Sequence, residues 1–171
     1  MGEKIFFTWE TQVIIMTIVF TLIMISSIVY LCWGISFKEK PLESSIRLLI
    51  AIFIVLAEIS LMTLTPRWVK YDEEGISIKK VIGKKKIAYK DITSIETITP
   101  KIISGSVRKR ASGGAGGYVG EFKNKTLGLY MMYATEKKDL VLVKCTDEII
   151  VFNCKKRDEL VEYAKDKLKT N

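Results

Sequence analysis

The chain has 171 residues, of which 49% are hydrophobic, and it carries a net charge of +8 and no histidine. Because histidine is missing, the sequence excludes a Ser/His or Cys/His dyad, a histidine metal ligand and an imidazole base that titrates near neutral pH. We therefore expect neither an enzyme nor a site for a metal or a cofactor.

The chain begins with a short mixed segment, residues 1–12, followed by a long apolar run, residues 13–35. The segment holds three aromatic side chains, Phe6, Phe7 and Trp9, of the kind found at the headgroup level of membranes. The run carries no charge, and about 20 helical residues cross the ~30 Å hydrocarbon core of a bilayer. We predict an interfacial segment at 1–12 and a first transmembrane helix at 13–35.

A polar connector, residues 36–45, leads to a second apolar run, residues 46–65, which is long enough for a second transmembrane helix. Two such helices place both ends of the chain on one side of the membrane. The basic residues flanking the helices are Lys38, Lys40 and Arg47 on the connector side, and Lys4, Arg67, Lys70, Lys79 and Lys80 on the other. The positive-inside rule then predicts a multi-pass protein of the cell (plasma) membrane with both termini in the cytoplasm.

The second apolar run contains one acidic residue, Glu58, about seven residues from its end and roughly 10 Å deep at the helical rise. An ionisable side chain at such a depth is a candidate functional site. The alternative is packing, with Glu58 bonded to Thr21, Ser26 or Ser27 of the first run. The sequence favours packing, because no second ionisable residue inside either run could complete a relay.

From residue 67 to residue 169 the pattern changes to short β runs, which predict one cytoplasmic domain. The predicted strands are RWVKY (67–71), ISIKKVI (76–82), KIAY (86–89), TSIETIT (93–99), LYMMYAT (129–135), LVLVKCT (140–146) and IIVFNC (149–154). A long irregular segment, residues 100–128, separates the fourth strand from the fifth. A closing helix at 156–169 has an apolar face formed by Leu160, Val161, Ala164 and Leu168.

Of the three cysteines, Cys145 and Cys154 lie in the predicted domain. Once the turn between their strands is placed, they are about five residues apart along the ladder, roughly 17 Å. A disulfide requires Cα atoms within about 7 Å, so we expect free thiols, which fit a reducing cytoplasm.

The order of four strands, a long loop, three strands and a C-terminal helix is similar to the pleckstrin-homology (PH) superfold. YDEEGISIKKVIGKKKIAYKDITSIE (71–96) resembles the opening of bacterial PH-domain proteins, and GYVGEFKNKTLGLYMMYATEKKDLVLVKCTDEIIVF (117–152) resembles their second half. The resemblance covers residues 67–168 and extends to two transmembrane helices ahead of the domain. It implies a mainly-β PH-like domain, a seven-stranded sandwich or partly open barrel capped by its helix, in a family whose biochemical role is largely unassigned.

Phosphoinositide-binding PH domains gather basic residues at the first hairpin, where this chain has Asp72, Glu73 and Glu74. The familiar headgroup pocket is therefore not expected. Basic residues that are candidates for binding anionic lipid lie elsewhere: Lys79, Lys80, Lys84, Lys85, Lys86, Arg108, Lys109, Arg110, Lys123 and Lys125. Near an anionic leaflet each contributes about 1 kcal/mol. The alternative, that they form a solvated face and protect strand edges, remains open.

The segment 100–128 is also rich in glycine. We expect Gly113, Gly114, Gly116, Gly117, Tyr118, Gly120 and Phe122 to shape it, with the two aromatic rings as anchors against the sandwich. GGAGGYVG matches neither GxGxxG nor GxxxxGK[ST] and has no acidic ribose partner, which argues against a nucleotide site. Nucleic acid is not expected either, because no aromatic residues interleave with the RKR run.

These observations predict a membrane-anchored PH-like binding or scaffold module that mediates protein–protein or self-association at the inner leaflet. Its expected partners are membrane lipids and either another protein or a second copy of the chain. The alternative is an accessory subunit of a membrane transport or signalling complex in which Glu58 is functional.

Overall fold

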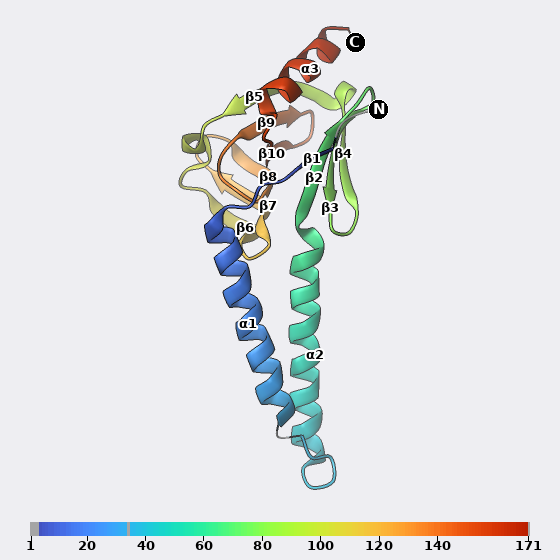
Figure 1. Cartoon of the computed structure of the whole chain (residues 1–171), viewed down its shortest axis with the longest axis vertical. Coiled ribbons are helices and arrows are strands. Elements are labelled where there is room, and N and C mark those ends of the chain that lie inside the picture. The colour runs from blue at the N-terminus through green and yellow to red at the C-terminus, as the bar shows by residue number, and fades with distance from the viewer. Residues whose placement is uncertain (1–3, 34, 171) are drawn as a thin grey trace.

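In the computed structural model, which describes residues 4–33 and 35–170, two long helices extend from one end of a β-sandwich (Figure 1). Helix α1 runs from Thr11 to Trp33 and α2 from Pro41 to Leu64, side by side. Both are long and apolar enough to span a membrane, and only 6% of the most apolar stretch of each is buried. A core helix of a soluble protein would be mostly buried, so this exposure indicates membrane association.

Helix α2 begins five residues before the predicted run, at Pro41. Proline suits this first helical position because the N–H that it lacks would have no partner there. Arg47 Nη2 then donates to Glu43 Oε1 at 2.7 Å, one helical turn away. Polar residues of the expected connector therefore lengthen the helix.

The first sheet has four antiparallel strands in the order β1-β2-β3-β4. They are β1 (Lys4–Phe6), β2 (Pro66–Tyr71), β3 (Gly75–Lys80) and β4 (Lys84–Ala88). A turn at residues 72–75 joins β2 to β3, and Gly75 has a φ of +152°.

Strand β1 corrects the prediction of an interfacial segment at 1–12. Ile5 pairs with Val69, and Ile5 and Phe7 are buried in the sandwich, whereas Phe6 and Trp9 are exposed. Alternating side chains of an extended segment point to opposite faces, so Ile5 and Phe7 cover the open edge of the core together. A strand of three residues is too short to show this alternation in the sequence, and residues 1–3 lie outside the described part of the chain.

The second sheet has six strands in the order β5-β9-β10-β8-β7-β6. The elements of this half are η1 (Tyr89–Asp91), β5 (Ile92–Ile98), η2 (Pro100–Ile103), β6 (Val107–Gly114), β7 (Gly117–Asn124), β8 (Gly128–Ala134), β9 (Leu140–Cys145) and β10 (Ile149–Asn153). Strand β10 pairs with β9 in an antiparallel hairpin and with β8 in parallel. The chain therefore crosses over between β8 and β9.

The predicted irregular segment 100–128 is wrong over most of its length, because it contains η2 and the β6–β7 hairpin. Its glycines and charges hide the alternation typical of a strand, and pairing of β7 with β8 supplies the stability that the local sequence lacks. The described chain therefore has ten strands where seven were expected.

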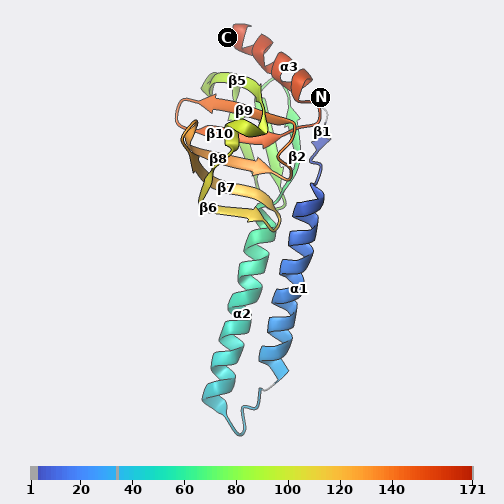
Figure 2. The same ribbon diagram turned by 90° about the vertical axis from the view of Figure 1, so that its left-hand side faces the viewer.

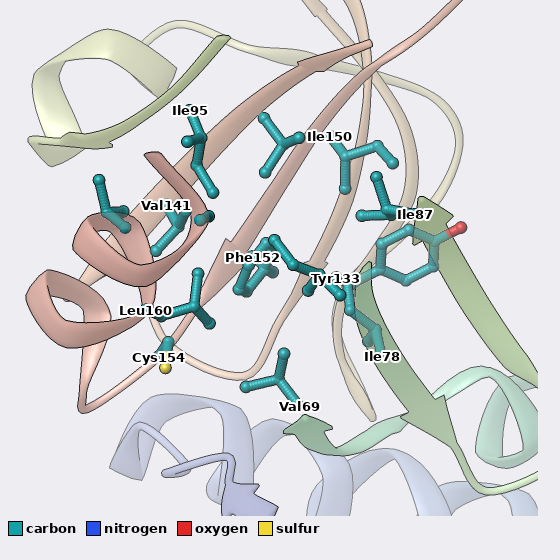
Figure 3. Packing of buried hydrophobic residues seen from close by; sticks show 14 of the residues in the cluster. Val69, Ile78, Ile87, Ile95, Tyr133, Val141, Ile150, Phe152, Cys154 and Leu160 are labelled. Carbon is teal, nitrogen blue, oxygen red and sulfur yellow. The ribbon is translucent and has the colours of Figure 1, made fainter. Parts of the chain in front are cut away.

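Two apolar layers cover the two faces of the six-stranded sheet. In the layer between the sheets, Val69 and Ile78 face Tyr133 and Phe152 (Figure 3). Helix α3 (Arg157–Thr170) closes this layer with the predicted residues Leu160, Val161, Ala164 and Leu168. The predicted fold class, a helix-capped PH-like sandwich after two apolar helices, is confirmed.

Cys145 and Cys154 are free, as predicted, and so is Cys32 of α1. Cys154 is buried, and its burial raises the pKa of the thiol to about 11. Burial likewise raises the pKa of Cys145. Both side chains therefore act as small neutral groups at neutral pH.

A fragment that begins at residue 67 is expected to be less stable than one that retains β1. Phe7 N donates to Arg67 O at 3.2 Å, and Thr17 and Leu61 both lie near Gly116, so residues 4–17 can be joined to residues 61–170 by a short Gly/Ser linker in place of the rest of both helices. This joint retains Val13 and the carbonyls of Thr63 and Thr65. We call this variant the helix-deleted sandwich. Its free energy of unfolding should exceed that of fragment 67–170 by about 3 kcal/mol, which is the typical cost of removing a buried Phe side chain. Urea unfolding measures the difference, and equal midpoints would show that β1 contributes nothing.

Candidate functional site

The tip of the β3–β4 hairpin, residues 79–84, lies against the last turn of α2. Val81 N donates to Thr65 O at 2.9 Å, and Ile82 N donates to Thr63 O at 3.1 Å. The side chains of Val81 and Ile82 nevertheless stay 44% and 65% exposed. Backbone hydrogen bonds thus hold two exposed apolar residues level with the end of an apolar helix.

Five lysines of this hairpin were predicted to bind anionic lipid, and in the described part of the chain two of them interact with carboxylates while three do not. Lys85 bonds to Glu148, and Lys86 lies 3.7 Å from a carboxylate oxygen of Glu74. The lysines that form no ion pair with any residue the structure describes are Lys79, Lys80 and Lys84. These three flank the apolar tip and carry its uncompensated positive charge.

The predicted RKR run lies on β6, which is an edge strand and, in Figure 2, the strand of its sheet nearest the helices. A β-bulge between Arg108 and Arg110 splits the run. Arg108 pairs with Phe122 and Arg110 with Glu121, so the two arginines point to opposite faces of the sheet. The run is therefore not one continuous basic patch.

The remaining two predicted basic residues, Lys123 and Lys125, are exposed at the end of β7 that lies away from the glycine-rich turn. Lys123 pairs with Val107 of β6 and Leu129 of β8, both exposed. The ten basic residues that were predicted to bind lipid thus lie on separate surfaces. Of these surfaces, the hairpin tip is held beside the end of α2 by backbone hydrogen bonds.

The turn between β6 and β7, residues 113–117, joins the sandwich to both helices and is named the glycine turn here. Gly116 N donates to Thr17 Oγ1 of α1 at 2.9 Å. A Cβ added at Gly116 would lie 2.8 Å from Thr65 Oγ1, and one at Gly114 would lie 3.6 Å from Met16. Gly116 also has a φ of +70°, which favours glycine. Gly116 is therefore needed for the close approach of this turn to the end of α2.

The two aromatic residues expected to anchor this segment, Tyr118 and Phe122, are 7% and 6% exposed. They pack in the second apolar layer, on the sheet face turned away from the first sheet, together with Val13 of α1. The start of α1 is therefore part of the sandwich core.

A buried polar network, which the sequence analysis missed, fixes the chain ahead of α1. Thr8 and Thr135 each donate a side-chain hydrogen bond, to Glu136 and to the Thr8 carbonyl respectively. Thr135 N donates to Asn153 Oδ1 at 3.0 Å, and Glu10 N donates to Thr135 O at 3.1 Å. No local sequence signal marks these residues, because their partners lie on distant strands. The network attaches the segment that precedes α1 to the strands of the sandwich.

Glu58 accepts a hydrogen bond from Thr21 Oγ1 at 2.7 Å. Thr21 is one of the three hydroxyl residues that the sequence proposed as partners, while Ser27 bonds instead within its own helix, to Ile23 O. The second carboxylate oxygen of Glu58 is buried and has no hydrogen-bond partner among the residues that the structure describes. The contact joins the two helices, with one of the partners that the packing interpretation predicted.

Replacing Glu58 with Gln is expected to leave the thermal stability of the full chain in detergent unchanged, because the amide oxygen still accepts from Thr21. Glu58→Leu should cost about 0.6 kcal/mol, the average for hydrogen bonds between membrane helices. Thr21→Val should cost the same, and the double variant no more. A functional defect in Glu58→Gln without a stability change would favour the alternative role for Glu58.

The fold and these contacts define a class of protein: a PH-like sandwich that contacts two helices long enough to span a membrane. The family described as Bacterial PH domain matches residues 68–168, and the chain belongs to this family, as its sequence resemblance predicted. The match runs from β2 into α3 and leaves β1 and both apolar helices outside it. No curated protein and no solved structure matches the chain.

Proposed function

We propose that the protein is a membrane-anchored binding or scaffold module whose hairpin tip rests on the anionic inner leaflet of the cell membrane. The observation that carries this proposal is the pair of backbone hydrogen bonds from Val81 and Ile82 to the last turn of α2. Where α2 leaves the hydrocarbon, these bonds hold the tip at headgroup depth, with both termini in the cytoplasm.

The tip has the chemistry of a membrane surface contact. Val81 and Ile82 offer apolar area to the acyl boundary, while Lys79, Lys80 and Lys84 offer positive charge to lipid phosphates. Each lysine near an anionic leaflet contributes about 1 kcal/mol, screened over about 10 Å. Because the helices already tether the domain, lipid binding serves to orient the sandwich.

Oriented in this way, the sandwich presents its far end to the cytoplasm. Helix α3 lies at that end, away from α1 and α2 (Figure 1), and its exposed face is densely charged. We propose that this end binds a protein partner or a second copy of the chain. The protein then acts as a binding module and not as a catalyst.

Sedimentation with lipid vesicles tests the lipid part of the proposal. The helix-deleted sandwich is expected to bind vesicles containing anionic lipid, to bind zwitterionic vesicles far more weakly, and to dissociate as salt rises from 0.1 to 0.5 M. Binding that ignores both lipid charge and salt would overturn this part.

Two experiments in cells test the orientation and the partner. Protease added outside intact cells should leave the sandwich uncut, and digestion would reverse the proposed topology. A photo-crosslinker placed at Lys165 on α3 should capture a second copy or another protein. Capture of lipid alone would remove the scaffold role.

A further inference from the structure

A pocket of about 330 Å³ opens on the sheet face turned away from the first sheet. Its floor is apolar and largely aromatic, and the residues that form it, Tyr118, Phe122, Tyr130 and Met132, are 2–7% exposed. The segment from η2 to β6, including Ile103, forms one wall. This volume lies within the range of small-molecule sites, roughly 300–1,000 Å³.

Two cations stand at the rim of this pocket, Arg108 and Lys137. The β6 bulge turns Arg108 to this face, where its guanidinium lies over Gly113: a Cβ at Gly113 would be 2.5 Å from Arg108 Nε. Lys137 Nζ lies 4.5 Å from the ring centroid of Tyr118. Neither cation forms an ion pair with a residue in the described part of the chain, so both can pair with an acidic ligand.

No acidic residue that the structure describes lines the pocket, although Glu10 lies near enough to Tyr118 to help raise the pKa of its phenol. Tyr130 shares a 2.7 Å hydrogen bond with Ser106, which also accepts from Asn124 Nδ2 at 3.1 Å. Burial raises the pKa of Tyr118 and that of Tyr130, so both phenols stay neutral. The pocket therefore offers an apolar floor, fixed hydroxyls and a doubly positive rim.

We propose that this pocket binds an amphipathic carboxylate, with the acidic group between Arg108 and Lys137 and the apolar body on the Tyr118, Phe122 and Tyr130 floor. The guanidinium fork matches a carboxylate in geometry and charge. A purely hydrophilic anion gains nothing from the aromatic floor, whereas an uncharged apolar molecule leaves the two cations unpaired. The site is separate from the hairpin tip, and it goes beyond the proposed function.

The proposal is tested with 2-naphthoate, titrated by its fluorescence into the full chain in zwitterionic nanodiscs. Saturable 1:1 binding is expected, at least 10-fold tighter than that of 2-naphthamide, its uncharged analogue. Decanoate is titrated in parallel: tighter binding of decanoate identifies a membrane source for the ligand, and tighter binding of naphthoate a soluble one. Inorganic phosphate that competes as strongly as naphthoate would overturn the assignment.

Three substitutions locate the site. Gly113→Leu fills the pocket without changing the net charge, and Gly113 has no left-handed φ to strain, so binding should fall at least 10-fold. Lys137→Ala should weaken binding about 10-fold, and its exposed neighbour Lys138→Ala less than 2-fold. Lys137 lies in an exposed turn, so this pair stays informative where Gly113→Leu unfolds. Equal affinities of Lys137→Ala and Lys138→Ala for naphthoate would overturn the proposed carboxylate site. That result would not bear on the proposal that the hairpin tip binds lipid.

Discussion

Replacing Lys79, Lys80 and Lys84 with Gln is expected to weaken binding of the helix-deleted sandwich to anionic vesicles by roughly 100-fold. Each lysine contributes about 1 kcal/mol near an anionic surface, so losing three costs about 3 kcal/mol. Every 1.4 kcal/mol is about a factor of ten in affinity. Vesicle sedimentation at 0.1 M salt, with the lipid concentration varied, measures the change.

The matched control places the same change of charge at the far end of the sandwich. Lys165, Lys167 and Lys169 lie on α3, away from the hairpin tip (Figure 1). Their replacement with Gln should change binding less than 3-fold, because charges beyond about 10 Å are screened at this salt. If both triple variants weakened binding equally, net charge would explain it, and the position of the tip would be irrelevant.

Replacing Gly116 with Ala is expected to destabilise the full chain by about 3 kcal/mol. The added methyl group would lie 2.8 Å from Thr65 Oγ1, at a position whose φ is +70°. A left-handed φ costs a non-glycine residue about 1–2 kcal/mol, and overpacking costs about 1–3 kcal/mol more. The collision falls where the glycine turn meets both helices, so the joint itself should loosen. Urea unfolding in detergent measures the loss.

Gly105→Ala is the matched control, because Gly105 has nearly the same φ, +66°, and nothing lies within 4 Å of its added Cβ. It should cost the backbone strain alone, about 1–2 kcal/mol. Thr65→Ala should restore part of the stability of Gly116→Ala by removing Oγ1. If Gly105→Ala and Gly116→Ala cost the same, the glycine turn does not press against α2.

The sequence was most informative where one segment contains its own signal. The uncharged run that became α1 is visible in composition alone, because a bilayer demands unbroken apolar length. Leu160, Val161 and Ala164 identify the buried face of α3 because the helical period places them together. The resemblance of residues 117–152 to bacterial PH domains is likewise visible in the amino-acid sequence alone.

Sequence patterns did not predict the segments that are stabilised by pairing with strands far away in the chain. Strand β1 exists because Ile5 and Phe7 meet the edge of β2, some 60 residues later in the chain. The β6–β7 hairpin contains five glycines that a pattern search assigns to a loop, yet pairing with β8 makes it part of a sheet. In both cases long-range hydrogen bonds outweigh weak local propensity.

The sequence by itself determined two apolar helices, a basic PH-like domain and its closing helix, because periodicity and composition are local properties. Only the tertiary structure decided that the Val81–Ile82 tip lies beside the end of α2, that the glycine turn touches both helices, and that a bulge separates Arg108 from Arg110. These features depend on which distant backbone groups find one another. Burial and hydrogen bonding between remote segments have no period along the chain from which they could be predicted.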